Sequence, residues 1–124
     1  MKAKTAKAKG RRLQNIVRDE LRKHYIEKWT KFPQLEDDDI KSQTMGMCGE
    51  DIVLSPAARK LIPYSFECKN VEKLNLWKAI TQCEDNAIKI DGSKKGEPAV
   101  VFKKNGKMPY VAISLEHFID LITR

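Results

Sequence analysis

The sequence predicts an α/β fold in which a mixed β-sheet is flanked by helices. The predicted elements follow in the order helix, strand, strand, helix, strand, strand, helix, and this order suits a sheet that is covered by helices. Hydrophobic residues make up 41% and charged residues 33% of the chain, as in a globular protein. Its 124 residues fit one domain with a modest core.

The first predicted element is an amphipathic helix. From about Arg11, apolar residues recur at three- and four-residue steps, and the pattern ends near Phe32-Pro33. Residues 1–9 instead alternate Lys with Ala and Thr. We therefore expect a disordered basic arm over residues 1–9 and a single domain over residues 10–124.

The positive charge is concentrated near the N-terminus. Residues 1–31 hold 11 Lys or Arg and 3 Asp or Glu, whereas the net charge of the whole chain is +7. Such a segment suits an acidic polymer, because each phosphate contact releases counterions and adds affinity without sequence preference. A solubilising tail is the alternative interpretation. The residues expected to contact a phosphate backbone are Lys2, Lys4, Lys7, Lys9, Arg11, Arg12 and Lys73.

Two strands are predicted in the middle of the chain, joined by a helical turn. Residues 36–49 are polar and contain two glycines, which is typical of a loop. A short apolar run, Ile52-Val53-Leu54, predicts the first strand. Ser55-Pro56 then predicts a helical turn, because Ser is a favoured cap and Pro a favoured first residue.

The second of these strands, residues 64–69, separates its side chains by parity. Phe66 and Cys68 project to one face of the strand, and Glu67 and Lys69 project to the other. We therefore expect Cys68 to lie in the core and not to act as a nucleophile.

The rest of the chain predicts a helix, a hairpin and a closing helix. Residues 73–87 have helical spacing, and strands follow at 99–102 and 110–113. Asn105-Gly106 between these strands is a strong hairpin signal. The last helix begins with a Ser114 cap. Its predicted buried stripe consists of Phe118, Leu121 and Ile122.

Asp51, Glu67 and Lys69 form a candidate catalytic group. Asp51 stands at the start of one predicted strand and Glu67 near the end of the next, so their carboxylates can meet. Converging carboxylates can hold Mg²⁺, which activates water and offsets charge in phosphodiester hydrolysis. Lys69 points the same way as Glu67 and can orient or deprotonate that water. Charged residues on an exposed edge strand are the simpler alternative.

The same residues resemble a known nuclease signature. Glu50-Asp51, a gap of 15 residues and Glu67-Cys68-Lys69 are similar to the PD-(D/E)-x-K motif, with Glu50 in the place of the usual Pro. The resemblance implies a restriction-endonuclease-like fold and a metal-dependent nuclease. It also implies that Asp51 and Glu67 bind Mg²⁺, for which Mn²⁺ can substitute.

The likeness extends to archaeal-type Holliday junction resolvases and the small phage endonucleases related to them. Lys9-Gly10, then Gln14, then Ser42 to Gly49 before the Asp follow their layout. The resolvases usually have a metal-contacting Glu at the position of Gln14, which implies a weaker, neutral ligand or a water-mediated one here. Further residues implied to contribute are Ser42 and Thr44 at the DNA backbone and Gln82 beside the site.

We therefore expect a Mg-dependent endodeoxyribonuclease, with branched DNA such as a Holliday junction as a candidate substrate. A junction has two-fold symmetry and needs two cuts, so a resolvase of this kind would act as a homodimer. Two rival interpretations stay open. One is a non-catalytic DNA-binding module of the same fold, suggested by Gln14, and the other is an RNA-processing nuclease.

The remaining features predict no further site. The acidic run at residues 36–39 lacks the glycine and closing Glu of a calcium loop. We expect His24 and His117 at the surface or as caps, and Trp29 and Trp77 in the core. The chain has no apolar run of about 18–20 residues and no Cys-x-x-Cys pair. We therefore expect a cytoplasmic protein with reduced thiols, no membrane contact and no organic cofactor.

Overall fold

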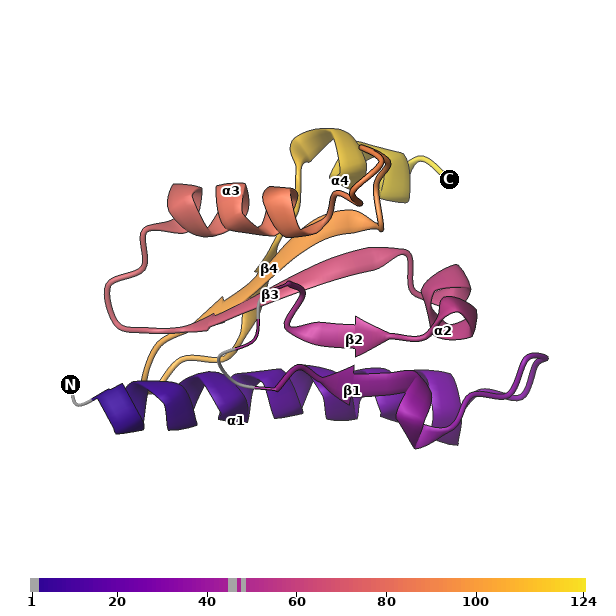
Figure 1. Cartoon of the computed structure of the whole chain (residues 1–124), viewed down its shortest axis with the longest axis horizontal. Coiled ribbons are helices and arrows are strands. Elements are labelled where there is room, and N and C mark those ends of the chain that lie inside the picture. The colour runs from indigo at the N-terminus through magenta and orange to yellow at the C-terminus, as the bar shows by residue number, and fades with distance from the viewer. Residues whose placement is uncertain (1–2, 45–46, 48) are drawn as a thin grey trace.

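A β-sheet lies between two helices in the structure, a computed structural model that describes residues 3–44, 47 and 49–124. Helix α1 (Ala3–Arg22) covers one face of the sheet, and α3 (Leu76–Asn86) covers the other (Figure 1). The architecture is a mixed α/β arrangement, as the order of the predicted elements indicates.

The central sheet contains the strands that carry the candidate site. Its order is β3 (Tyr64–Asn70), β4 (Glu97–Lys103) and β5 (Tyr110–Ala112). Strands β3 and β4 are parallel, whereas β4 and β5 are antiparallel, so the sheet is mixed. The hairpin predicted at Asn105-Gly106 is present, and Gly106 has a φ of +75°, which glycine adopts at low cost.

A second, two-stranded sheet contains a strand within the predicted loop. Strand β1 (Ile40–Ser42) pairs antiparallel with β2 (Ile52–Leu54). With one apolar residue in three, β1 shows no alternating pattern in the sequence, and its pairing with β2 decides its conformation. The backbone N–H of Asp51 donates to the Phe66 carbonyl at 3.0 Å, which joins this pair to the edge of β3.

The parity predicted for β3 is confirmed by the packing of its two faces. Cys68 packs against Leu13 of α1, so its side chain lies in the core. Val100, the partner of Glu67 in register, packs on the opposite face against α3. Glu67 and Lys69 therefore share the α3 side of the sheet.

The first helix begins and ends earlier than the sequence pattern indicates. Residues 3–9 form the first turns of α1 and are not a disordered arm. Lys and Ala are good helix formers, so they extend the helix without an apolar stripe. α1 ends at Arg22 and continues as a π-helical turn to Glu27, short of Phe32-Pro33. Among the described residues, no helix is both long and apolar enough to cross a bilayer.

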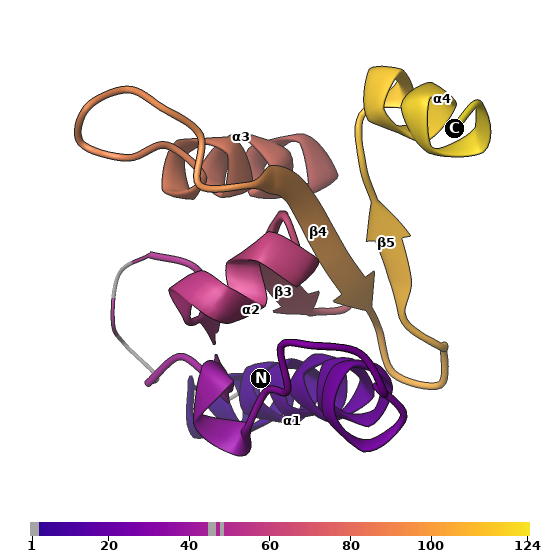
Figure 2. The same ribbon diagram turned by 90° about the vertical axis from the view of Figure 1, so that its right-hand side faces the viewer.

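The short helices confirm their predicted caps. Helix α2 (Pro56–Leu61) is capped by Ser55, whose Oγ accepts from the Ala58 N–H at 3.1 Å. Helix α4 (Leu115–Ile122) is capped in the same way by Ser114. Figure 2 shows α4 and β5 along one side of the molecule.

The predicted burial of α4 is wrong. Phe118, Leu121 and Ile122 are 48%, 37% and 61% exposed, whereas His117 is buried. The His117 ring shares a hydrogen bond of 2.6 Å with the Tyr64 hydroxyl, so it is not a surface group. An amphipathic pattern identifies an apolar face but does not determine whether the rest of the chain covers it.

The two tryptophans also differ from the prediction of core packing. Trp77 on α3 is 81% exposed. Trp29 is half-buried, and its indole N–H donates to the Pro33 carbonyl at 3.1 Å. Part of the apolar face of α3 is therefore left uncovered by the sheet.

Candidate active site

Asp51 is held against β3 by two backbone groups. Its own N–H donates to the Phe66 carbonyl at 3.0 Å, and its carboxylate Oδ2 accepts from the Cys68 N–H at 2.7 Å. Because Phe66 and Cys68 flank Glu67 in the strand, these bonds place the Asp51 carboxylate beside the Glu67 carboxylate. The convergence that the sequence predicts is therefore present.

Glu67 is buried, and two neighbours hold its carboxylate. Lys69 Nζ lies 3.5 Å from Oε1. The Asn86 side-chain amide donates to Oε2 at 3.3 Å and to the Gly49 carbonyl at 3.2 Å. Asn86 therefore connects the end of α3 to both the carboxylate and the segment that precedes Asp51.

The electrostatics of the site favour a bound cation. Burial raises the pKa of Asp51, although the Cys68 N–H and the Lys69 charge oppose the rise. Burial and the neighbouring Asp51 charge raise the pKa of Glu67. Two buried carboxylates resist ionising together, and a divalent ion between them would remove that penalty.

Gln14 of α1 approaches Asp51 from the other side of the sheet. It is 6% exposed, and its Oε1 is buried without a hydrogen-bond partner among the described residues. Its side chain lies close enough to Asp51 to lower the pKa of that carboxyl. Two carboxylates and an amide oxygen fit Mg²⁺, which binds hard oxygens and keeps several waters. In the described part of the chain, no third acidic, His or Cys side chain completes a larger ligand group.

A comparison with protein families agrees with this geometry. The family described as "Phage putative PDDEXK endonuclease" matches residues 5–123. The chain belongs to this phage PD-(D/E)XK endonuclease family. Membership confirms the resemblance drawn from the motif and implies a restriction-endonuclease-like fold and endonuclease activity. No curated protein and no solved structure matches the chain.

In this phage-family endonuclease, Glu50 belongs to the scaffold. Both of its carboxylate oxygens accept from Arg59 Nη2, at 2.8 and 2.9 Å. Arg59 also donates to the Tyr64 carbonyl at 2.9 Å. Because the Glu50 carboxylate is paired with Arg59, we assign Glu50, which stands in the usual Pro position, to positioning the loop before Asp51.

Asn86, and not Gln82, contacts the candidate catalytic group among the described residues. Gln82 is exposed on α3, one helical turn before Asn86, and has no hydrogen bond to Asp51, Glu67 or Lys69 in the described structure. The sequence holds a signal for this choice. Asn86 follows the buried Cys83 by three positions, which places both residues on the face of α3 that meets the sheet.

The residues expected to contact DNA divide into two groups. Lys7, Arg11, Arg12, Thr44 and Lys73 are exposed. Lys9 is 2% exposed and pairs with Glu72 at 3.5 Å, so the prediction that it contacts DNA is wrong. Its position on α1 directs the amine toward the end of β3 instead of solvent. The Ser42 hydroxyl donates to Asn15 Oδ1 at 2.9 Å. Lys2 and the Lys4 side chain lie outside the described part.

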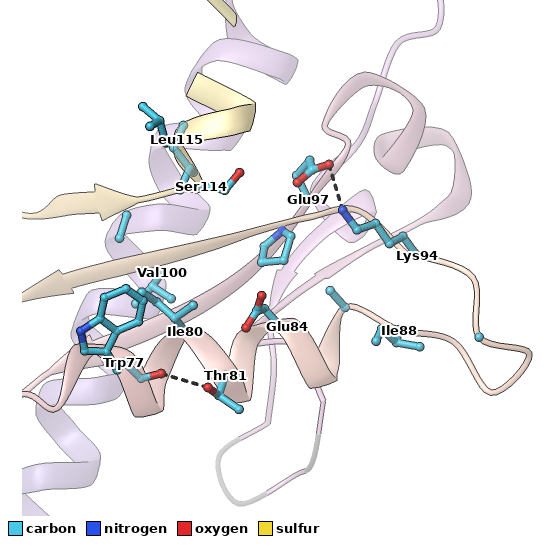
Figure 3. A pocket seen from close by; sticks show the side chains of 15 residues that line it. Trp77, Ile80, Thr81, Glu84, Ile88, Lys94, Glu97, Val100, Ser114 and Leu115 are labelled. Atoms are coloured by element: carbon cyan, nitrogen blue, oxygen red, sulfur yellow. Dashed lines mark hydrogen bonds and ion pairs between the residues drawn. The ribbon is translucent and has the colours of Figure 1, made fainter. Parts of the chain in front are cut away.

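A cavity away from the catalytic carboxylates lies between α3, the start of β4 and the start of α4 (Figure 3). Its volume is ≈ 690 Å³, and its walls include Trp77, Ile80 and Leu115. The carboxylate of Glu97 at its rim is paired with Lys94 at 3.1 Å. Among the described residues that line it, this cavity therefore holds no second group of converging free carboxylates.

Proposed function

We propose that this phage-family endonuclease hydrolyses phosphodiester bonds of DNA at the group Asp51, Glu67 and Lys69, with Mg²⁺ as cofactor. The observation that carries the proposal is the convergence of the buried Glu67 carboxylate and the half-buried Asp51 carboxylate with an amine 3.5 Å from Glu67. The Gln14 oxygen, which is buried and has no hydrogen-bond partner among the described residues, supports a cation at the same place.

Each residue of the group has a distinct task in this mechanism. Asp51 and Glu67 would hold the ion, with Gln14 as a neutral third donor. Bound there, Mg²⁺ would activate a water and offset phosphate charge, and Mn²⁺ would do the same through the same hard oxygens. Lys69, kept in place by Glu67, orients the attacking water and places a positive charge beside the phosphate.

Positioning residues keep these groups in register. The Cys68 N–H fixes the rotamer of Asp51, and Asn86 fixes the second oxygen of Glu67. Gln14 adds no charge, so the protein supplies two formal negative charges at the ion, fewer than a site with Glu at this position.

Duplex or branched DNA is the substrate that the charge distribution favours. Lys7, Arg11 and Arg12 are exposed along α1, and contacts from such residues recognise the backbone and not the base sequence. We propose branched DNA, and a homodimer that makes two cuts in it. The exposed apolar residues of α4 support a protein partner on that side.

A cleavage assay with matched variants tests the proposal. Wild-type protein, Asp51→Asn and Lys69→Ala are incubated with a four-way DNA junction, a linear duplex and a matched RNA, with Mg²⁺. We expect wild type to cut DNA and both variants to lose cleavage while their DNA affinity stays within about twofold, because affinity comes mainly from phosphate contacts. Glu84→Gln, an exposed carboxylate of α3, is the control that keeps activity.

The other outcomes separate the rival functions. DNA binding by wild type without cleavage would identify a non-catalytic binding module, and cleavage of RNA alone would identify an RNA-processing nuclease. Activity retained in Asp51→Asn would rule out the site. Light scattering of wild type with and without the junction determines whether two copies assemble.

A further inference from the structure

We propose that a pocket beside the catalytic group binds an unpaired nucleotide of the DNA substrate, with its base on Tyr110 and its phosphates at Lys103, Lys104 and Lys107. The proposal rests on the proposed function, because it extends the nucleic-acid site from Lys69 across the sheet. The pocket lies between residues 71–74 and the turn that joins β4 to β5, and its volume is ≈ 320 Å³.

The walls of this pocket are apolar and include an exposed aromatic ring. Leu74, Phe102, Met108 and Tyr110 line it. Tyr110 is 63% and Met108 69% exposed, and the Tyr110 ring lies 6.4 Å from the Phe102 ring between centroids. An exposed flat ring next to cations is the combination on which single-stranded nucleic acid stacks.

The strand register connects the pocket to the catalytic group. Lys69 is paired with Phe102 across β3 and β4, and Phe102 is paired with Tyr110 across β4 and β5. Residues paired in register point to the same face of a sheet. With strands about 4.8 Å apart, Tyr110 lies about 10 Å from Lys69.

The charge around the pocket suits phosphates. Lys103, Lys104 and Lys107 lie at its rim with Glu72 as the acidic residue among its lining. The Glu72 carboxylate is already engaged, since it accepts from the Asn105 N–H at 2.8 Å and pairs with Lys9 at 3.5 Å. Three lysines therefore remain to neutralise phosphates.

Glu72 also positions the turn that carries these lysines. Through Asn105 it holds the β4–β5 turn, and through Lys9 it holds the first turns of α1. The turn is closed by the Lys107 N–H, which donates to the Lys104 carbonyl at 3.1 Å. Glu72 thus holds the first turns of α1 and the β4–β5 turn, two basic segments far apart in sequence, at one end of the sheet.

The ligand that fits is acidic and carries a flat apolar group, as a nucleotide does. Bases inside a duplex are already stacked on their neighbours, and only an unpaired base can place its face on Tyr110. The pocket therefore favours DNA with a single-stranded segment, such as a branch or a tail, over a continuous duplex.

Binding measurements on two probes test this preference. Fluorescence anisotropy compares a labelled blunt duplex with the same duplex carrying a single-stranded tail, in Ca²⁺ so that the probes stay intact. We expect Tyr110→Ala to weaken binding of the tailed probe by roughly 5- to 150-fold, the range for loss of one base–aromatic stack. Binding of the blunt probe changes by less than about twofold. Tyr110→Phe keeps the ring and keeps the affinity.

A second pair of variants tests the lysines. Lys104→Ala with Lys107→Ala should reduce the salt slope for the tailed probe by about 0.7 per lost contact. Lys60→Ala, an exposed lysine of α2, is the control and leaves the slope unchanged. Should Tyr110→Ala fail to fold, Tyr110→Leu keeps an apolar side chain without a flat ring, and the same loss is expected.

Two results would overturn the inference without touching the proposed function. In the first, Tyr110→Ala and Tyr110→Leu bind the tailed probe with the affinity of wild type. In the second, these variants lose affinity equally for the tailed and the blunt probe while wild type still cuts DNA. Failure of wild type to bind either probe would overturn the proposed function and, with it, this inference.

Discussion

Asp51 shows how a single backbone amide can orient the side chain of a proposed metal ligand. The Cys68 N–H, 2.7 Å from Oδ2, comes from the residue between Glu67 and Lys69. Strand β3 therefore supplies the side chains of Glu67 and Lys69 and also orients the side chain of Asp51. The backbone of Phe66 and Cys68 holds Asp51, and Glu67 lies between them in β3. A small shift of this strand would therefore move Asp51, Glu67 and Lys69 together.

Asn86→Ala tests the role assigned to the Glu67 partner. Removing the amide leaves Glu67 Oε2 without its donor, and loss of such a support typically reduces metal affinity or activity by about 10- to 100-fold. We expect the Mg²⁺ concentration for half-maximal cleavage to rise while the thermal midpoint changes little. Gln82→Ala is the matched control on the same helix, and an equal effect of the two variants would contradict the assignment.

Asp39 gives a prediction for pH at a distance from the site. The Glu36 N–H and then the Ser55 hydroxyl lower the pKa of Asp39. A carboxyl with a depressed folded pKa stabilises the protein above its unfolded pKa of about 3.9, and this contribution is lost as the pH falls through the folded value. Urea unfolding at pH 7 and pH 3 should therefore show a smaller acid loss for Asp39→Asn than for wild type. Asp38→Asn, exposed in the same turn, should behave as wild type.

At the scale of elements, α1 combines an exposed basic face with a buried face that packs on the sheet. Its exposed face carries Lys7, Arg11 and Arg12, whereas Lys9, Leu13 and Gln14 face the sheet. Successive residues of a helix point in directions 100° apart, so neighbouring basic residues need not share a role. The basic count in the sequence cannot separate a phosphate contact from an internal ion pair.

Lys7→Ala and Lys9→Ala should therefore differ. We expect Lys7→Ala to reduce the salt slope of DNA binding by about 0.9, the value for one phosphate contact on duplex DNA, at an unchanged thermal midpoint. Lys9→Ala should lower the thermal midpoint, because Glu72 loses its partner and a buried stem is removed. Salt titrations and thermal melts of both variants check this, and matching behaviour would be evidence against two roles on α1.

At the scale of the whole molecule, the proposed metal would join three distant segments. Gln14 lies on α1, Asp51 precedes β2 and Glu67 lies on β3. The free energy of metal binding would therefore stabilise the packing of α1 and the β1–β2 pair on the central sheet, besides serving the reaction.

Removal and return of the metal should change global stability. An ion present at about 100 times its dissociation constant adds about 2.7 kcal/mol to the free energy of unfolding. For a domain of this size we expect Mg²⁺ to raise the thermal midpoint by several degrees over the value in EDTA. Asp51→Asn should show little or no rise, and a full rise in that variant would place the ion elsewhere.

The local pattern of the chain was sufficient for the catalytic group and most elements. Strand parity places Glu67 and Lys69 on one face, because it depends only on residues two positions apart. The motif that these residues form with Asp51, across a gap of 15 residues, indicates the family that the comparison confirms. The caps at Ser55 and Ser114 and the turn at Gly106 follow from the same local rules.

Only the tertiary structure decided which faces are covered and which distant residues meet. The burial of Lys9, the exposure of Trp77 and the contact of Asn86 with Glu67 depend on packing between elements far apart in sequence. The alignment of Lys69, Phe102 and Tyr110 across the sheet depends on the register of β3, β4 and β5. Packing between distant elements sets these relations, and the pattern within one element does not determine which distant element lies against it.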